Sequence, residues 1–380
     1  MIEKIPFNRP WQSGFEKKYL SKVLELSHFS GDGHYSFKCS EYLENIIKTK
    51  KALITHSCTA ALEMTALLAD IKEGDEVIMP SYTFVSTANA FVLRGATPVF
   101  IDIDARNLNL DITKIEPAIN ERTKIIVPVH YAGVGCNMDE IIQIAKNYNL
   151  LVVEDAAQAY GATYKGQYLG TMGDLGTLSF HETKNIISGE GGSLLVNNEE
   201  FIDKAEIIRE KGTNRKNFLK GKVDKYTWVS MGSSYLPSEL ISAFLLAQLE
   251  SSDYIQKERM TIWNYYYEKT SQLEAQGYVR RPYVPSFCNH NAHMFYLVLR
   301  EDINRDRIIS EFKRNGITIT FHYVPLHTSP GGLKYGKYYE ELKNTDNLHK
   351  RIIRLPIWIG LTHKDLDKIV NLLYELIIDF

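Results

Sequence analysis

Cysteine is scarce in this chain of 380 residues, which contains only four. No two of them are closely spaced, so neither a disulfide framework nor a zinc knuckle is indicated. Cys288 lies near His290 and His293, which raises the question of a metal site. We favour a polar loop that leads into the strand expected at 293–300, and we predict no bound metal.

The chain also lacks an excess of charge and long apolar runs. Its 44 basic and 46 acidic residues give a formal net charge of −2, which does not favour a nucleic acid partner. No apolar stretch approaches the ~20 residues of a membrane span, and the first thirty residues have no apolar core of signal-peptide type. We therefore expect a cytoplasmic protein without a membrane partner.

The length of the chain favours two domains, because 380 residues exceed what one ordinary core accommodates. No repeat or low-complexity tract marks a linker. A change of pattern near residue 250 predicts a large domain over 1–250, including an N-terminal arm, and a smaller C-terminal α+β domain over 251–380.

Between residues 52 and 197, short apolar runs alternate with segments of helical spacing. The runs are continuously Val, Ile and Leu rather than alternating, as in strands covered by helices on both faces. This pattern predicts an α/β fold with a mostly parallel central sheet. Strands are expected at 53–55, 76–79, 98–101, 125–129, 150–154, 176–180 and 193–197, and helices at 59–69, 87–93 and 138–148.

The second half of the chain is less regular. Residues 211–233 are polar and indicate an excursion, and long helices are expected over 238–274. The tail then shows a strand near 293–300, a helix near 304–315, a short strand-like run at 318–321 and a final helix.

An acid and a lysine carry the chemical signal of the sequence. Asp155 follows a buried strand, where open α/β sheets bind their ligands, although an Asp there also caps a helical turn. Lys184 comes 29 positions later (184 − 155) in a polar turn between two expected strands. Chemistry with pyridoxal phosphate uses such a pair. The lysine holds the cofactor as a Schiff base, and the carboxylate keeps the pyridine nitrogen protonated.

Other residues are candidates for holding the same cofactor. Cys58 and Thr59 open the helix expected at 59–69, and a helix start binds phosphate, although capping by Ser57 explains the hydroxyl there equally well. Ser179 offers another hydroxyl. Phe84 is a candidate for stacking on the pyridine ring, although an aromatic residue at such a position belongs more often to the core.

Several strings of residues resemble the nucleotide-sugar aminotransferases of the DegT/DnrJ/EryC1/StrS family. They are Cys58-Thr59-Ala60-Ala61-Leu62-Glu63, Gly74-Asp75-Glu76-Val77-Ile78, Glu154-Asp155-Ala156-Ala157-Gln158 and Lys184. The resemblance extends across essentially the whole chain and implies pyridoxal phosphate and the type I fold of its transferases. By resemblance, Lys184 carries the cofactor, Asp155 pairs with the pyridine nitrogen and Gln158 bonds the ring oxygen. Cys58, Thr59 and Ser179 surround the phosphate, and Phe84 covers the ring.

The resemblance also implies a homodimer with its active site at the interface. Many members of the family supply an asparagine from the neighbouring subunit to the phosphate, and this chain has Ser234 there. Many also have an arginine where this chain has Leu236. A serine still donates one hydrogen bond, whereas the loss of the arginine leaves the donor's carboxylate without a binding group. Arg215 is the substitute that we predict.

Longer strings are similar to a narrower subgroup of the same family. They cover residues 75–91, 127–133, 180–185, 209–215 and 321–327. Within or beside these strings we expect Tyr82, His181, Tyr323 and His327 to face the substrate. The pair His322 and His327 is also a metal candidate, which we disfavour because no acid or cysteine is near.

The subgroup implies transfer of an amino group from L-glutamate to the C4 keto group of dTDP-4-keto-6-deoxy-D-glucose, giving dTDP-4-amino-4,6-dideoxy-D-galactose. Such a product serves O-antigen or enterobacterial common antigen synthesis. Amination with the opposite C4 configuration, or of a C3 keto sugar, stays open. A dehydratase is disfavoured because the dehydratases of the family replace the lysine with histidine. A non-catalytic protein is disfavoured because Lys184, Asp155 and Gln158 are all present.

Overall fold

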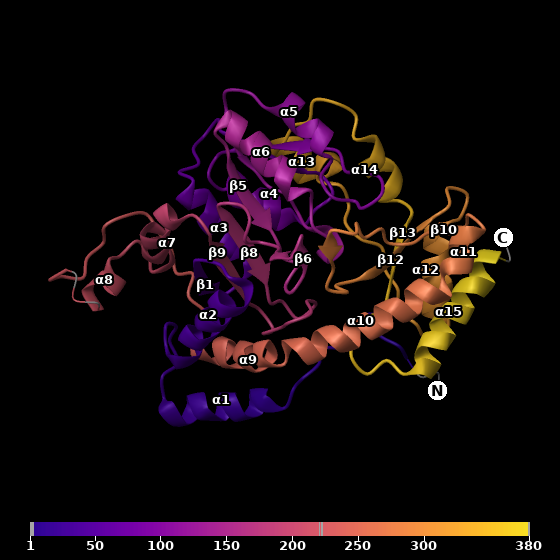
Figure 1. The fold of residues 1–380 in the computed structure, drawn as a ribbon, viewed down its shortest axis with the longest axis horizontal. Helices are drawn as coiled ribbons and strands as arrows, with labels where there is room; N and C mark the ends of the chain where they lie inside the picture. Colours follow the sequence, from indigo (N-terminus) through magenta and orange to yellow (C-terminus); the bar gives the residue numbers. More distant parts are fainter. Residues whose placement is uncertain (1–3, 220, 222, 379–380) are drawn as a thin grey trace.

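A seven-stranded sheet forms the centre of the computed structural model, which describes residues 4–219, 221 and 223–378 (Figure 1). The pairs β2–β3, β2–β4, β4–β5 and β5–β8 are parallel, and β9 is antiparallel to both β8 and β1. The mostly parallel sheet and the return of the chain from β8 to β9 agree with the sequence pattern. In spatial order the strands are β1 (Lys51–Thr55), β9 (Gly192–Val196), β8 (Leu175–Ser179), β5 (Leu151–Asp155), β4 (Thr123–Ile126), β2 (Glu76–Pro80) and β3 (Thr97–Ile101).

Both faces of this sheet are buried, which explains the continuous apolar runs. Successive side chains of a strand point to opposite faces. Leu53 accordingly enters one hydrophobic core, whereas Ala52 and Ile54 enter the other. The helices whose apolar residues join these cores include α2 (His34–Ile47), α3 (Cys58–Leu68), α4 (Val85–Val92), α5 (Ile115–Ala118), α6 (Met138–Tyr148), α7 (Ile202–Arg209) and α9 (Glu239–Glu250).

A second, smaller part of the chain has its own core and an antiparallel three-stranded sheet in the order β10-β12-β13. The N-terminal arm belongs to this part, because Ile5 exchanges backbone hydrogen bonds with Gly316 and Thr318, both 2.9 Å long. Figure 1 shows α9 and α10 running nearly end to end from the large part to the small one. The elements are α10 (Ser252–Lys269), α11 (Ser271–Ala275), β10 (Val279–Arg280), β12 (Phe295–Leu299), α12 (Arg305–Arg314), β13 (Ile352–Leu355) and α15 (His363–Ile378).

The predicted division at 250/251 coincides with the junction of α9 and α10, but the later chain does not stay in the small part. Lys337 exchanges backbone hydrogen bonds with Pro98 and Phe100, beside β3 of the large sheet. The division therefore stays a prediction. The remaining elements are α1 (Phe15–Leu26), α8 (Arg215–Leu219), α13 (Pro330–Tyr335), α14 (Lys343–Leu348), η1 (Ile112–Lys114), η2 (Tyr131–Gly133), η3 (Glu199–Phe201), η4 (Leu326–Thr328), and a minor sheet of β6 (Thr163–Tyr164), β7 (Gln167–Tyr168) and β11 (Cys288–Asn289).

The run at 318–321 differs from the expected strand. Instead of a strand, the Thr318 amide donates to the Ile5 carbonyl and Thr320 forms an isolated antiparallel bridge with Arg354. Across the described part of the chain, no helix has both the length and the apolar character that crossing a membrane requires.

Candidate active site

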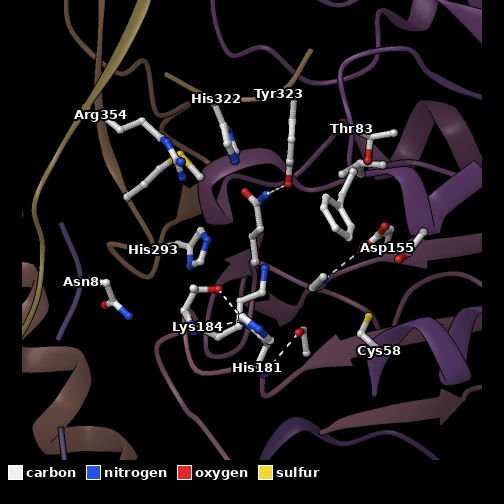
Figure 2. Close-up of a pocket in the computed structure, with 18 of the residues that line it drawn as sticks. Asn8, Cys58, Thr83, Asp155, His181, Lys184, His293, His322, Tyr323 and Arg354 are labelled. Carbon is white, nitrogen blue, oxygen red and sulfur yellow. Dashed lines mark hydrogen bonds between the residues drawn. The ribbon is translucent and has the colours of Figure 1, made fainter. Parts of the chain in front are cut away.

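A cavity of about 870 Å³ lies between the two parts of the chain, at the carboxyl ends of β5 and β8. Ligand sites of open α/β sheets occupy this place. Figure 2 shows its side chains converging from both parts. Nine of the residues predicted from the sequence line it: Cys58, Thr59, Phe84, Asp155, Gln158, Ser179, His181, Lys184 and Tyr323.

Asp155 is the last residue of β5 and its side chain is only 5% exposed. Its carboxylate accepts a hydrogen bond from the Thr87 hydroxyl at 2.7 Å and one from the Ala157 amide at 3.1 Å. The bond from the Ala157 amide is the turn-capping interaction, which is the alternative role predicted for Asp155 from the sequence. A carboxylate has about four acceptor positions, so it still has capacity for a protonated ring nitrogen in the cavity.

Lys184 is held in the loop between β8 and β9. Its amide donates to the His181 carbonyl at 2.9 Å, and the Ser188 amide donates to the Phe180 carbonyl at 2.7 Å. Burial lowers the pKa of the Lys184 amine, against the opposing effects of Cys58 and Asp155. The neutral amine, which burial favours, is the form that attacks a carbonyl carbon.

The start of α3 forms an anion site in the same cavity. The Ser57 hydroxyl caps the helix by accepting from the Ala60 amide at 3.0 Å, and the first helical N–H groups have no partner within the helix. Burial raises the pKa of Cys58 to about 12, so its thiol remains protonated beside an anion. A Cβ at Gly192 would lie 2.4 Å from the Cys58 nitrogen, so only glycine lets β9 pass beneath this helix start.

Thr59 and Ser86 extend the anion site toward α4, because their hydroxyls lie 2.7 Å apart. Ser179, at the end of β8, lines the same cavity. We call Cys58, Thr59, Asp155, Ser179 and Lys184 the sheet wall. This wall supplies an amine, a carboxylate and an anion site, which are the three groups that pyridoxal phosphate needs, so the residues fit this cofactor.

Gln158 and Tyr323 connect the two parts of the chain across the cavity. The Gln158 side chain donates to the Tyr323 hydroxyl at 2.6 Å and accepts from the Ala132 amide at 2.7 Å. One N–H of the amide remains for a ligand. Phe84 is 56% exposed, and its ring centre lies 6.3 Å from that of Tyr323. It therefore lies at the cavity rather than in the core.

His181 lies at the edge of the cavity and is partly exposed. Its Nδ1 lies 2.9 Å from the Thr183 hydroxyl, and its Nε2 lies 3.6 Å from Glu190. The imidazole thus has a polar neighbour on each side, which fixes its orientation at the entrance.

The small part contributes side chains that the sequence did not assign to a cofactor or substrate site, two of which, His293 and His322, were considered only as metal candidates. His322 stacks on Tyr323 with ring centres 3.7 Å apart, and its Nδ1 lies 2.8 Å from the Tyr131 hydroxyl. His293 lies 3.1 Å from the Asn185 side-chain oxygen. Burial lowers the pKa of both histidines well below the usual range, so both rings are neutral. Together with Arg354 and Tyr323 they form what we call the C-terminal wall.

Two predicted substrate residues lie behind this wall rather than in it. Tyr82 is 1% exposed and packs against Tyr323 with ring centres 5.6 Å apart. His327 is fixed by Ser81, 2.7 Å from its Nδ1, and by Asp346, 3.3 Å from its Nε2. Neither side chain lines the cavity. They support the residues that do.

Ser234 and Arg215 also lie outside the cavity of this chain. Ser234 forms a bridge with Glu210, and the Arg215 guanidinium is 4.0 Å from the Glu210 carboxylate. Figure 1 shows α8, which begins at Arg215, projecting away from the small part. Both residues were predicted from an arrangement across a dimer interface, so their roles stay predictions.

The metal alternatives have ordinary explanations in the structure. His290 stacks on Trp263 with ring centres 4.2 Å apart, and the Cys288 thiol donates to the Gly135 carbonyl at 3.8 Å. Within residues 4–219, 221 and 223–378, no three His, Cys, Asp or Glu side chains are grouped so that they could hold a metal ion.

Comparisons with known proteins identify related chains. The family model described as the DegT/DnrJ/EryC1/StrS aminotransferase family matches residues 12–374. The spore coat polysaccharide biosynthesis protein SpsC of Bacillus subtilis is 33% identical over 99% of this chain and 99% of its own. GDP-perosamine synthase of Caulobacter vibrioides is 31% identical, again over 99% of both chains.

A solved structure shows the same fold. The PMP form of Spr1654 from Streptococcus pneumoniae has a TM-score of 0.91 and 25% identity over 99% of this chain and 98% of its own. A PLP form of the same protein has also been solved. The α/β architecture predicted from the sequence is confirmed as the type I fold of pyridoxal phosphate-dependent transferases.

Proposed function

Because the chain belongs to the DegT/DnrJ/EryC1/StrS aminotransferase family, we propose that it moves an amino group from L-glutamate to a nucleotide-linked keto sugar. The chain is a pyridoxal phosphate-dependent sugar aminotransferase, as the family and its relatives establish. The specific substrate that we propose is dTDP-4-keto-6-deoxy-D-glucose, aminated at C4 to dTDP-4-amino-4,6-dideoxy-D-galactose. We also propose that the reaction occurs in the cytoplasm and serves O-antigen or enterobacterial common antigen synthesis.

One observation carries the proposal: Lys184, Asp155 and the start of α3 surround a single cavity. Pyridoxal phosphate, when bound, supplies a cationic ring that accepts the electron pair left on carbon when a proton is removed. We assign Asp155 to hold the ring nitrogen in its protonated form, and the start of α3 to hold the phosphate.

Lys184 has the second task, which is to move protons. Its amine takes a proton from the substrate carbon of the amino donor and returns one to the sugar carbon that receives the nitrogen. A flexible stem on a fixed loop suits this movement, because the ammonium group must reach two positions. The C-terminal wall excludes water from the region where Lys184 acts, which strengthens the electrostatic effect of Asp155.

The sugar nucleotide is chosen on the residues shared with the narrower subgroup, at 75–91 and 321–327. Both segments contribute to the cavity, through Phe84 and Tyr323 among others. A GDP-linked keto sugar is a second candidate, because a GDP-perosamine synthase is 31% identical over almost the entire chain. The opposite C4 configuration and a C3 keto sugar are further alternatives that the product would reveal.

A second copy of the chain is part of the proposal. Large apolar side chains are exposed near the cavity and on the excursion at 211–233, which directly precedes Ser234: Phe84 is 56%, Met231 55% and Trp228 79% exposed. Groups of this kind favour a protein interface. Light scattering is expected to give twice the mass of the chain, and a monomer that is fully active would overturn this part of the proposal.

The experiment that tests the reaction uses purified enzyme with pyridoxal phosphate, L-glutamate and either dTDP-4-keto-6-deoxy-D-glucose or its GDP counterpart. NMR of the product identifies the aminated carbon and its configuration. We expect dTDP-4-amino-4,6-dideoxy-D-galactose, with the GDP sugar processed at least tenfold more slowly. Preference for the GDP sugar, or an equatorial amine at C4, would replace the proposed substrate or product by one of the alternatives.

A further inference from the structure

Arg354 enters the cavity from β13 with most of its hydrogen-bonding capacity unused. Its Nε donates to the Phe321 carbonyl at 3.1 Å. In the described part of the chain no Asp or Glu forms an ion pair with it, and neither of its terminal nitrogens has a protein acceptor. Figure 2 shows its guanidinium pointing into the cavity beside His322 and His293.

Two buried arginines of this chain provide a comparison with Arg354, which is partly exposed. Arg259 also lines the cavity, but its three nitrogens donate to the carbonyls of Ala292, Ile357 and His293. Arg209 donates to the Ile54 carbonyl and pairs with Asp32. Both have a structural role that occupies them. The terminal nitrogens of Arg354 have no such structural partners, although its Nε hydrogen bond holds the side chain in place.

The Arg354 guanidinium is held at two places: Phe7 packs against one face, and Nε donates to the Phe321 carbonyl. Its central carbon lies 4.9 Å from the ring centre of Phe7, so the N-terminal arm covers one face. The remaining edge carries the paired N–H groups that match a carboxylate in two parallel hydrogen bonds. Stacking leaves that edge open, so Arg354 is oriented before a ligand arrives.

Among the described residues, no carboxylate forms an ion pair with this cation, and the phenols of Tyr131, Tyr323 and Tyr82 near it are neutral because burial raises their pKa values. Burial also lowers the pKa of Arg354. The adjacent His293 and His322 are neutral. Arginine remains protonated in proteins, so the C-terminal wall presents one uncompensated positive charge to the cavity.

We propose that Arg354 binds a carboxylate of the amino donor, the role predicted from sequence for Arg215. This inference rests on the proposed function, since it assumes that an amino acid is the donor. It assigns the role to Arg354, which lines the cavity, whereas Arg215 lies outside the cavity of this chain and its role across a dimer interface stays a prediction.

The position of Arg354 favours the donor over the sugar nucleotide, whose diphosphate is the other anion that enters. Arg354 and Lys184 line the same cavity, so a donor that reaches the Lys184 amine also enters the space into which Arg354 points (Figure 2). The α-carboxylate of an amino acid is bonded to the carbon from which Lys184 removes a proton. In a nucleotide sugar, the sugar ring separates the diphosphate from the reacting C4.

The test uses the Arg354→Gln, Arg354→Lys and Arg354→Ala variants of the cofactor-loaded enzyme, with Arg314→Gln as control because Arg314 is an exposed arginine of the small part. We measure the half-reaction with L-glutamate alone and the binding of glutarate, a dicarboxylate without an amino group, by calorimetry. Arg354→Gln is expected to weaken both by about 100-fold, with a higher KM rather than a lower kcat, as loss of a charged hydrogen-bonded partner does.

The second half-reaction, in which the keto sugar is aminated, distinguishes donor from sugar. With the pyridoxamine phosphate form and the keto sugar nucleotide, Arg354→Gln is expected to stay within about threefold of the wild type. Added guanidinium should partly restore the glutamate half-reaction of Arg354→Ala, and Arg354→Lys should be intermediate, since a lysine supplies charge without the planar fork.

Three results would overturn the inference: glutarate binding unchanged in Arg354→Gln, an equal loss in both half-reactions, or a loss confined to the sugar. Failure of the proposed function is distinguishable. In that case the wild type itself fails to aminate the keto sugar, whereas the glutamate half-reaction and glutarate binding can still be compared between wild type and variants.

Discussion

The two walls of the cavity are built in contrasting ways. The sheet wall comes from strand ends and helix starts within the large part, and its acid and base are held by hydrogen bonds of the loops that follow β5 and β8. The C-terminal wall is assembled from segments at 293, 322–323 and 354, which are far apart in the sequence. It contains one free cation and two neutral imidazoles.

The contrast corresponds to two proposed tasks. The sheet wall carries out the transfer of the amino group, and the C-terminal wall selects the substrate. The sheet wall provides what every amino-group transfer with this cofactor requires, namely an amine, a carboxylate and a phosphate site. In the assignments that we propose, the C-terminal wall contacts what differs between reactions, namely the donor and the sugar. Substitutions in the first wall should abolish both half-reactions, whereas those in the second should alter them unequally.

The largest effect is expected for Lys184→Ala, which removes the amine of the sheet wall. Both half-reactions should slow by at least about 10⁴-fold, because the covalent attachment and the proton carrier are lost together. The visible absorbance of the attached cofactor should disappear from the spectrum of the variant. Lys165→Ala removes an exposed lysine paired with Asp139 and serves as the control. Turnover that persists in Lys184→Ala would contradict the assignment.

Asp155→Asn is expected to cost about 10³-fold in kcat of both half-reactions, because an amide cannot hold a ring nitrogen in its protonated form. Stopped-flow measurements of the two half-reactions test this. Thr87→Val is the matched variant, since it keeps the carboxylate and removes only the hydroxyl that donates to it at 2.7 Å. A loss of about tenfold is expected there. If both variants lose the same activity, the charge of Asp155 is not what matters.

The sequence predicted the sheet wall because its residues lie in continuous segments with recognisable surroundings. Asp155 follows an apolar strand, Cys58 and Thr59 open a helix, and Lys184 lies between two strands. Each position is defined by its neighbours along the chain, so the pattern of apolar residues was sufficient to locate it. The strands and helices of the large part were predictable for the same reason.

The C-terminal wall was only partly predictable, because its members are brought together by tertiary packing. Tyr323 was found through the resemblance of its segment to a known subgroup. Arg354 lies on an ordinary short strand, and nothing around it in the sequence distinguishes it from the other arginines of the small part. Its significance appears only when its unpaired terminal nitrogens are compared with those of Arg259 and Arg209. His327 shows the converse, since its motif was recognised but its ring is fixed by Ser81.

A smaller effect is expected for Tyr323→Phe, which breaks the hydrogen bond between Gln158 of the large part and the C-terminal wall. The Gln158 amide then loses its partner at 2.6 Å, and loss of one such bond corresponds to about tenfold in rate. The loss should be greater for the sugar half-reaction than for the glutamate one, since Tyr323 belongs to the wall that selects the substrate. Steady-state kinetics with each substrate varied tests this, and Tyr338→Phe is the control on an exposed tyrosine. Equal losses would remove the distinction between the walls at this position.

The smallest effect concerns the pH dependence of stability in the segment that leads into the C-terminal wall. Burial lowers the pKa of His290 to about 4, against about 6.5 in an unfolded chain. Between these values the unfolded state binds more protons, so the free energy of unfolding should decrease as the pH falls from 6.5 toward 4. The full stability is present above pH 6.5. The slope for one group is at most about 1.4 kcal/mol per pH unit.

His290→Asn should make this slope shallower, because asparagine does not titrate but its side-chain oxygen can still accept from the Ala292 amide, as Nδ1 does at 3.1 Å. Loss of the stacking on Trp263 lowers stability equally at every pH, so it leaves the slope unchanged. Urea unfolding at several pH values between 4.5 and 7 measures the slope, with the exposed His363→Asn as control. Carboxylates such as Glu76 also destabilise the protein as they protonate, but mainly below pH 4.5. A slope that is the same in wild type and His290→Asn would show that this histidine is not kept neutral by burial.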